Sequence, residues 1–156
     1  MTSEEQQHIV CAVRGGPESR ETVTRAIELA LARDARLTFF RVMDAEFLEH
    51  ATVAPLSVIY RELENMAEFA IRILCDRAER KGVKDVDCLV RAGNIQRQIR
   101  EFVAEQHIDL VVMGRPVRSP GSNVFKPAAF DTFVADLEQA AGVRVEVVTP
   151  SPQPKE

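Results

Sequence analysis

The stretch from Asn94 to Gly114 reads NIQRQIREFVAEQHIDLVVMG and contains two different apolar patterns. In its first half, apolar residues stand three or four positions apart, which is the period of a helix with one apolar face. They are Ile95, Ile99, Phe102 and Val103. Its second half contains the continuous apolar run LVVM at 110–113, which is typical of a buried strand. The stretch therefore predicts a helix that leads into a strand.

The same alternation of short apolar runs and helical stripes extends over the whole chain. The runs that predict strands are 9–13 (IVCAV), 37–43 (LTFFRVM), 86–90 (VDCLV), 110–113 (LVVM) and 143–148 (VRVEVV). The other helical stripes are Val23, Ala26, Ile27, Ala30 and Leu31; Ile59, Leu63, Met66, Ala70 and Leu74; and Phe130, Phe133, Val134 and Leu137. Strict alternation predicts an α/β fold, an open parallel sheet of five strands with helices on both faces, because parallel strands need crossovers.

Capping residues stand near the limits of the expected helices. Ser19 and Asn94 have side chains that accept hydrogen bonds from the first turn of a helix. Gly82 and Gly142 stand directly after expected helices, where the backbone often adopts the left-handed conformation that glycine favours. These residues support helix boundaries that agree with the apolar stripes.

The length and composition indicate a single folded domain. The chain has 156 residues, of which 46% are apolar and 28% charged, values typical of globular proteins. We expect an N-terminal extension at 1–7, the domain at 8–149 and a flexible tail at 150–156, where prolines are frequent and no apolar period exists. Residues 44–57 match neither period and form the one long connection.

The charge and the apolar content exclude several kinds of partner. The net charge of −4 offers no whole-chain basic field for nucleic acid or an anionic membrane. No run of 18 apolar residues is long enough to span a membrane, and the start of the chain lacks the apolar segment of a secretory signal. We therefore expect a cytoplasmic protein that contacts neither nucleic acid nor membrane.

The cysteines and histidines give no catalytic or metal-binding pattern. Cys11, Cys75 and Cys88 are widely spaced and odd in number, which matches neither a disulfide framework nor a zinc site. Cys11 and Cys88 stand within apolar strands, so we expect both to be inert core residues. His8, His50 and His107 have no identifiable catalytic partner, and we expect them at the surface.

Ligands of open parallel sheets bind beyond the carboxyl ends of the strands, where the strand order reverses. The loops that leave the expected strands therefore hold the candidate site. The first strand is followed by Arg14 and Gly15, and the third is followed by Arg91. The fourth is followed by a long loop that contains Gly114, Arg115, Arg118, Gly121 and Ser122.

The order of these segments resembles the universal stress protein family. The run VVMG at 111–114, its preceding helix and the turn Arg91-Ala92-Gly93 resemble the second half of such a domain. The strand IVCAV and the segment IELALARDARL at 27–37 resemble its first half. The resemblance covers about residues 8–149 and implies a Rossmann-like sheet of order 3-2-1-4-5, in which the loops after strands 1 and 4 are neighbours.

The nucleotide-binding pattern of that family is degenerate in this chain. The family has an acidic residue where Arg14 stands and a second motif glycine where Val117 stands. Its closing Gly-Ser or Gly-Thr pair falls on Pro127-Ala128 or on Asp131-Thr132, depending on the alignment. An arginine cannot accept hydrogen bonds from ribose hydroxyls, and a proline lacks an N–H for phosphate. We therefore expect that ATP is not held in the family's usual mode.

The strand-end loops are locally basic, and two interpretations of that charge stay open. The candidate residues are Arg14, Gly15, Arg91, Gly114, Arg115, Arg118, Gly121 and Ser122. Arginine forks and glycine-rich backbone could bind a phosphate, a nucleotide or another small anion. Alternatively, the arginines are solvated and pair with acidic side chains of the surface.

The resemblance implies a cytoplasmic regulatory or interaction module in stress response, without catalytic residues, metal or bound cofactor. The alternatives are a nucleotide or anion binder that uses the basic strand ends and, with less support, an enzyme related to ATP pyrophosphatases. The fifth strand, Val143 to Val148, would form an edge of the sheet, and family members commonly dimerise through it. We therefore expect a homodimer, with a further protein partner that the sequence does not identify.

Overall fold

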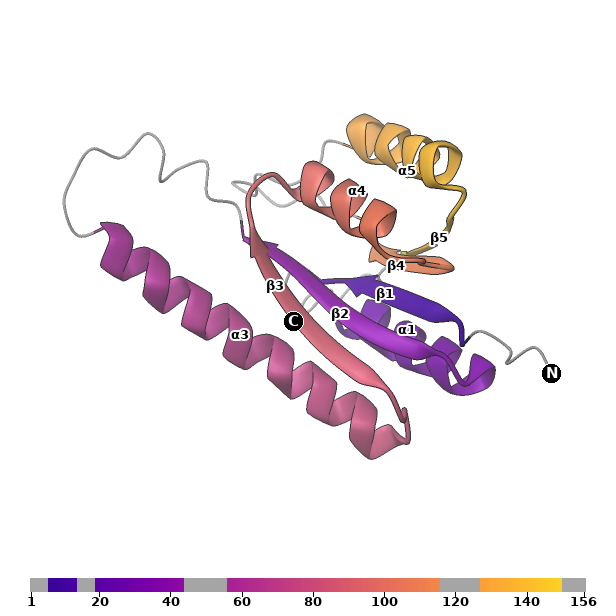
Figure 1. Cartoon of the computed structure of the whole chain (residues 1–156), viewed down its shortest axis with the longest axis horizontal. Helices are drawn as coiled ribbons and strands as arrows, with labels where there is room; N and C mark the ends of the chain where they lie inside the picture. The colour runs from indigo at the N-terminus through magenta and orange to yellow at the C-terminus, as the bar shows by residue number, and fades with distance from the viewer. Residues whose placement is uncertain (1–5, 14–18, 44–55, 116–126, 150–156) are drawn as a thin grey trace, which may run out of the picture.

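The computed structural model describes residues 6–13, 19–43, 56–115 and 127–149 (Figure 1). The strands and helices alternate along the chain as predicted. In chain order they are β1 (His8–Ala12), α1 (Ser19–Arg33), β2 (Arg36–Met43), α3 (Leu56–Lys81), β3 (Val86–Ala92), α4 (Ile95–Glu105), β4 (Leu110–Gly114), α5 (Pro127–Ala141) and β5 (Arg144–Val148).

The five strands form one parallel sheet of order β3-β2-β1-β4-β5, which confirms the order that the resemblance implied. β1 lies in the middle, with Ile9 level with Leu37 of β2 on one side and Leu110 of β4 on the other. The chain order therefore reverses between β1 and β4, where the carboxyl ends of neighbouring strands diverge into loops that lead to opposite faces.

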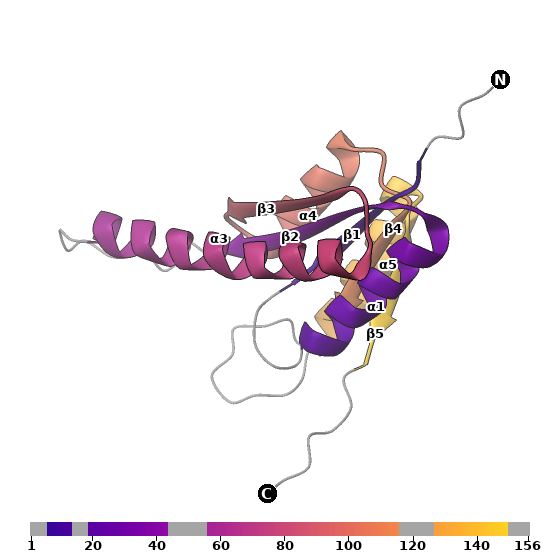
Figure 2. The ribbon, with the colours of Figure 1, turned by 90° about the horizontal axis from the view of Figure 1, so that it is seen from below.

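The two faces of the sheet carry two separate apolar cores. On one face, α1 and α3 cover the side chains of Ile9, Leu37 and Val112. On the other, α4 and α5 cover Val10 and Val111, because successive side chains of a strand point to opposite faces. Figure 2 shows α1 and α3 together in front of the sheet. The predicted two-sided covering is therefore confirmed.

The helix ends follow the capping signals, with one addition. The side chain of Asn94 accepts a hydrogen bond from the N–H of Arg97 at 3.0 Å. Gly82 and Gly142 have φ values of 109° and 63°, which confirms their left-handed conformation after α3 and α5. The residue after α1 is Asp34, with φ of 50°, because a short polar side chain also tolerates this region. α1 begins at Ser19, and the capping role predicted for that side chain lies outside the described residues.

α3 is longer than the strands it covers. Its 26 residues extend about 39 Å, whereas the seven residues of β3 extend about 23 Å. The first half of α3 consequently projects past the end of the sheet (Figures 1 and 2). From residue 58 onward, where the burial of this helix is described, the first buried residue is Ala67, followed by Ile71, Cys75 and Ala78. The apolar stripe predicted from Ile59 to Leu74 is therefore not the buried face, and most of it is exposed.

The cysteines depart from the prediction at one position. Cys11 is fully buried in β1, as expected, and Cys75 is buried on α3. Cys88 is exposed, so its assignment to the core was wrong. The reason is its place on β3, an edge strand that has a neighbour on one side only. Within the described residues, none of the helices combines the length and apolar character that crossing a membrane requires.

Candidate functional site

A small, partly open hollow lies where β1, β2 and β4 end beneath α4 and α5. Its walls are almost entirely apolar. The lining residues are Ala12, Val13, Phe40, Val42, Ile95, Ile99, Met113, Gly114 and Phe130. The position beside the β1–β4 reversal is where ligands of open parallel sheets bind. The described walls offer van der Waals contact and backbone groups but no charged side chain.

Gly114 ends β4 at a point of close contact with α1. A Cβ atom at this position would lie 2.7 Å from Oγ1 of Thr22, a side chain that is itself buried. Only a residue without a side chain lets the helix and the strand approach this closely. The glycine that matches the first glycine of the family's nucleotide motif therefore has a packing role in this chain.

Arg115 follows Gly114 and turns toward α5. Its Nη1 lies 3.3 Å from Oδ1 of Asp131, and its guanidinium carbon lies 5.9 Å from the centre of the Phe130 ring. Its backbone N–H donates to the carbonyl of Val148 at 2.8 Å. The arginine is thus oriented by a carboxylate, a ring and the edge strand. A small anion at this point would compete with Asp131.

Arg91 lies on β3 and is directed over α4. Its Nη2 is 3.0 Å from Oε2 of Glu105. Its guanidinium lies 5.3 Å from the ring centre of Phe102 and 5.9 Å from that of Phe40. The two rings are stacked with centres 4.8 Å apart. This arrangement combines an ion pair with cation–π contacts, which stabilise the packing of α4 on the sheet.

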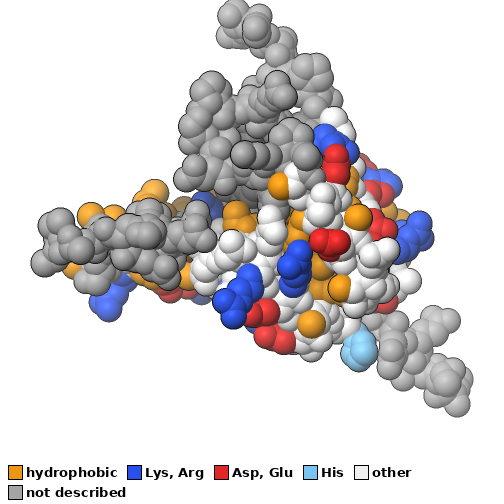
Figure 3. All heavy atoms as spheres, turned by 90° about the horizontal axis from the view of Figure 1, so that it is seen from above, with side chains coloured by type: hydrophobic (Ala, Val, Ile, Leu, Met, Phe, Trp, Pro, Cys, Tyr) orange, Lys and Arg blue, Asp and Glu red, His pale blue; other side chains and the backbone are white. Residues whose placement is uncertain are grey.

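The structure places two of the arginines and one glycine of the predicted site, and the rest falls outside the described residues. Arg14, Gly15, Arg118, Gly121 and Ser122 belong to that remainder. Figure 3 shows basic and acidic side chains mixed on the face covered by α4 and α5. This mixture agrees with the ion pairs of Arg91 and Arg115.

The start of α5 bears on the two alignments left open by the sequence. The helix begins at Pro127, so Pro127-Ala128 stands at the opening of the last helix, where the family pattern has Gly-Ser. Asp131 lies one turn further in and contacts Arg115. Because proline has no N–H, one of the free backbone donors at this helix start is missing.

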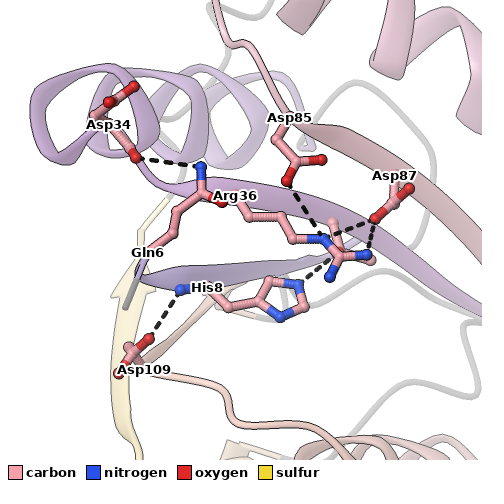
Figure 4. A network of polar contacts seen from close by, with 8 residues as sticks. Gln6, His8, Asp34, Arg36, Asp85, Asp87 and Asp109 are labelled. Atoms are coloured by element: carbon pink, nitrogen blue, oxygen red, sulfur yellow. Dashed lines mark hydrogen bonds and ion pairs between the residues drawn. The ribbon is translucent and has the colours of Figure 1, made fainter. Parts of the chain in front are cut away.

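A polar network lies at the amino ends of the strands, at the other end of the sheet from the hollow (Figure 4). It was not anticipated from the sequence. His8, predicted at the surface, is buried, and its Nε2 lies 2.7 Å from Oγ1 of Thr38. Its backbone N–H donates to Asp109 at 2.8 Å, and burial, followed by the nearby Arg36, lowers its pKa. His107 is exposed as expected, and His50 lies outside the described residues.

Arg36 extends the network to β3. It donates two hydrogen bonds to Asp87 and lies 3.9 Å from Asp85. The network joins the amino ends of β1, β2, β3 and β4, far along the strands from the hollow. Its groups are paired with one another, which indicates a structural role. In the described part of the chain, no group of three or more His, Cys, Asp or Glu side chains could hold a metal ion.

Comparison with known proteins agrees with the fold. A model of the universal stress protein family matches residues 6–126. This chain belongs to the universal stress protein family. No curated protein sequence gives a significant match. The solved universal stress protein UspA from Lactobacillus plantarum superposes with a TM-score of 0.69 and 22% identity, covering 91% of this chain and 97% of that one.

Two further solved universal stress proteins resemble this member of the family. One, determined in complex with cAMP, has a TM-score of 0.64 and 21% identity over 94% of this chain and 98% of its own. Another, from Burkholderia pseudomallei, has a TM-score of 0.62 and 18% identity over 93% and 96%. At such identities the structures show the shared fold, so ligand contacts must be argued from this chain's own residues.

Proposed function

We propose that this universal stress protein is a cytoplasmic regulatory or interaction module in stress response that does not hold ATP in the family's usual mode. The observation that carries the proposal is the pairing of both described candidate cations with carboxylates of their own chain, Arg115 with Asp131 and Arg91 with Glu105. A triphosphate would have to displace these carboxylates. Arg14, Val117 and Pro127 remove further contacts that the family's nucleotide pattern supplies.

Titration calorimetry with ATP and magnesium tests this proposal. We expect no sub-micromolar binding by the unmodified protein. The Asp131→Asn variant keeps the size of the side chain but removes the charge opposite Arg115, so it should bind phosphate groups better than the parent. Glu101→Gln is the matched control, because Glu101 pairs with Arg97 on the exposed side of α4. Sub-micromolar ATP binding by the parent protein would contradict the proposal.

The hollow favours a second candidate function, the binding of a nucleotide or small anion in a different pose. Phe40 and Phe130 are buried beneath the hollow, so a nucleobase would contact only its apolar mouth. A related universal stress protein was solved in complex with cAMP. Calorimetry with cAMP, AMP and phosphate tests this candidate. Binding to a nucleobase in the hollow should be lost in Ile99→Trp, which fills the space, whereas an anion site should be lost in Arg115→Gln and weaken with salt.

The proposed module has no catalytic function, and its candidate site includes no catalytic residue or metal. Incubation with ATP or cAMP and chromatography of the products test this part. We expect the nucleotide to be recovered unchanged. Turnover that persists in the Ile99→Trp variant would indicate a contaminating enzyme, and turnover abolished by that variant would contradict the proposal.

We also propose that β5 pairs with β5 of a second copy in a homodimer. β5 is an edge strand in the sheet order, and Arg144 is exposed there. Glu146 is already bound to Arg25 of α1 at 2.7 Å, so the pairing depends on backbone groups rather than on an Arg144–Glu146 bridge between copies. The carbonyl of Val148 points to β4, and by alternation the N–H groups of Val145 and Val147 point outward.

This orientation determines which proline substitution tests the β5 pairing. Val147→Pro removes an outward N–H, which a monomer tolerates at an edge but an added strand does not. Val147→Ala is the matched control, because it shortens the side chain and keeps the N–H. Light scattering should show the dimer mass for Val147→Ala and the monomer mass for Val147→Pro. An unchanged mass in Val147→Pro would contradict pairing through β5.

A further inference from the structure

α3 carries an exposed apolar stripe that begins in its projecting first half and continues past the middle of the helix. Of the described large hydrophobic side chains that are exposed, six lie on this helix. They are Val58, Ile59, Leu63, Met66, Phe69 and Ile73. Met66 and Phe69 are 67% and 69% exposed, and Ile73 is 49% exposed. At about 100° per residue, the six positions span about 140° of the helix circumference, and all but Leu63 lie well away from the side that contains Ile71 and faces the sheet.

An apolar stripe of this size indicates a missing contact. Together, the six side chains expose an apolar area on the order of several hundred Å². This area is comparable to the largest apolar patches that monomers normally expose. The segment 58–66 contains no buried residue. A short helical segment without packing is only marginally stable in water. The stripe would therefore gain both apolar burial and helical stability from a partner.

The charges that accompany the stripe are self-complementary. Glu62 and Arg77 are exposed, lie within the same side of α3, and have no ion-pair partner among the described residues. They are 15 positions apart, which corresponds to about 22 Å along the helix. The point midway between them lies between Phe69 and Ala70, within the C-terminal part of the stripe.

A two-fold axis through that midpoint places the part of the stripe between Glu62 and Arg77 against the same part of a second copy. In an antiparallel pair of α3 helices, Glu62 of each copy stands level with Arg77 of the other. Met66 stands level with Ile73, so the stripe residues Leu63, Met66, Phe69 and Ile73 lie between the two ion pairs, and Val58 and Ile59 lie outside them. A parallel pair would instead place Glu62 against Glu62 and Arg77 against Arg77, which is unfavourable. The contact uses the same surface of both copies and closes after two chains.

We propose that a second copy of this chain covers the exposed stripe of α3 through antiparallel helix pairing centred between Phe69 and Ala70. An unrelated protein would need an apolar helix with opposite charges at the same spacing, whereas a second copy has them already. α3 lies toward the β3 edge of the sheet and β5 forms the opposite edge, so this contact is separate from the β5 pairing. If both contacts form, the protein assembles beyond a dimer.

Charge exchange is the sharpest test of this arrangement. Sedimentation velocity over micromolar to submillimolar concentrations would give the association constant of the parent protein and of Glu62→Arg, Arg77→Glu and the double variant. Each single change replaces two attractions by two repulsions, so the Kd should rise about tenfold. The double variant restores opposite charges and should return to within about threefold of the parent. A double variant no better than the singles would overturn the antiparallel register.

An apolar change tests the stripe itself. Phe69→Gln should reduce the mass of the assembly by half at concentrations where the parent associates, and Leu31→Gln should leave the mass unchanged. Leu31 is the matched control because it is an exposed leucine on α1, outside the stripe. Circular dichroism confirms that the variants are folded. An unchanged mass in Phe69→Gln would overturn the proposal. A parent protein that stays monomeric at submillimolar concentration would also overturn it, even if the stripe of that monomer binds another protein.

Discussion

Replacing Gly114 with alanine tests whether this motif glycine is required by packing. The added Cβ would lie 2.7 Å from Oγ1 of Thr22, closer than real contacts allow. Gly114 is not among the glycines with positive φ, so alanine adds no backbone strain there. Overpacking of this kind costs about 1–3 kcal/mol, and the lower entropy of the unfolded alanine chain recovers about 0.4–1 kcal/mol. The expected net loss is about 1–2 kcal/mol.

Urea denaturation of a double-mutant cycle isolates the contact. Thr22→Ala removes the hydroxyl that the new Cβ would meet, so Gly114→Ala should cost at least about 1 kcal/mol less in the Thr22→Ala background than in the parent. In thermal denaturation, each kcal/mol corresponds to a Tm change of about 2–4 °C for a domain of this size. Additive effects of the two substitutions would refute the packing explanation.

Gly142→Ala is the control for this cycle. Gly142 has φ of 63°, and a Cβ there meets no atom within 4 Å. Its substitution should cost about 1–2 kcal/mol through the left-handed backbone alone. That cost should be the same with and without Thr22→Ala, because the two sites share no contact.

Three further predictions concern other parts of the molecule. The pKa of His8 in the folded protein lies below its unfolded value of 6.5, so the unfolded state binds more protons. The free energy of unfolding should therefore fall as the pH drops from about 7 to 5. In urea titrations, His8→Gln should remove the part of this pH dependence that His8 causes. Phe102→Ala removes a buried ring beneath an arginine and should cost about 3–5 kcal/mol in the same assay. A thiol reagent should label Cys88 in the native protein and should label Cys11 and Cys75 only after unfolding. The reason is that burial shields these two thiols and raises their pKa. Rapid labelling of all three cysteines would contradict the described burial.

The elements of the fold could be predicted because their signals are local. Each strand run falls within or beside an observed strand, and the capping roles of Asn94, Gly82 and Gly142 are confirmed. These features depend on residues a few positions apart, which the sequence displays directly. The strand order came from the family resemblance, because apolar periodicity does not state which strands are neighbours.

The candidate site could be located from the sequence but not described. Arg91, Gly114 and Arg115 were predicted as site residues because they stand at the carboxyl ends of expected strands. Their partners Glu105, Thr22 and Asp131 come from other elements or later turns, and only the packed structure shows these contacts. Whether an arginine is open to an anion depends on which carboxylate lies within reach, and sequence spacing does not determine that distance.

The sequence by itself determined an alternating α/β chain with two-sided covering of a parallel sheet, because apolar period and capping chemistry are properties of short segments. Only the tertiary structure decided which apolar residues are buried. The stripe of α3 was correctly identified as helical, yet Met66 is exposed and Ile71 is buried, because a helix longer than its sheet meets the core along part of its length. His8 is buried because its tertiary context satisfies its polar groups. Thr38 of β2 contacts its ring, and Asp109, directly before β4, accepts from its backbone N–H.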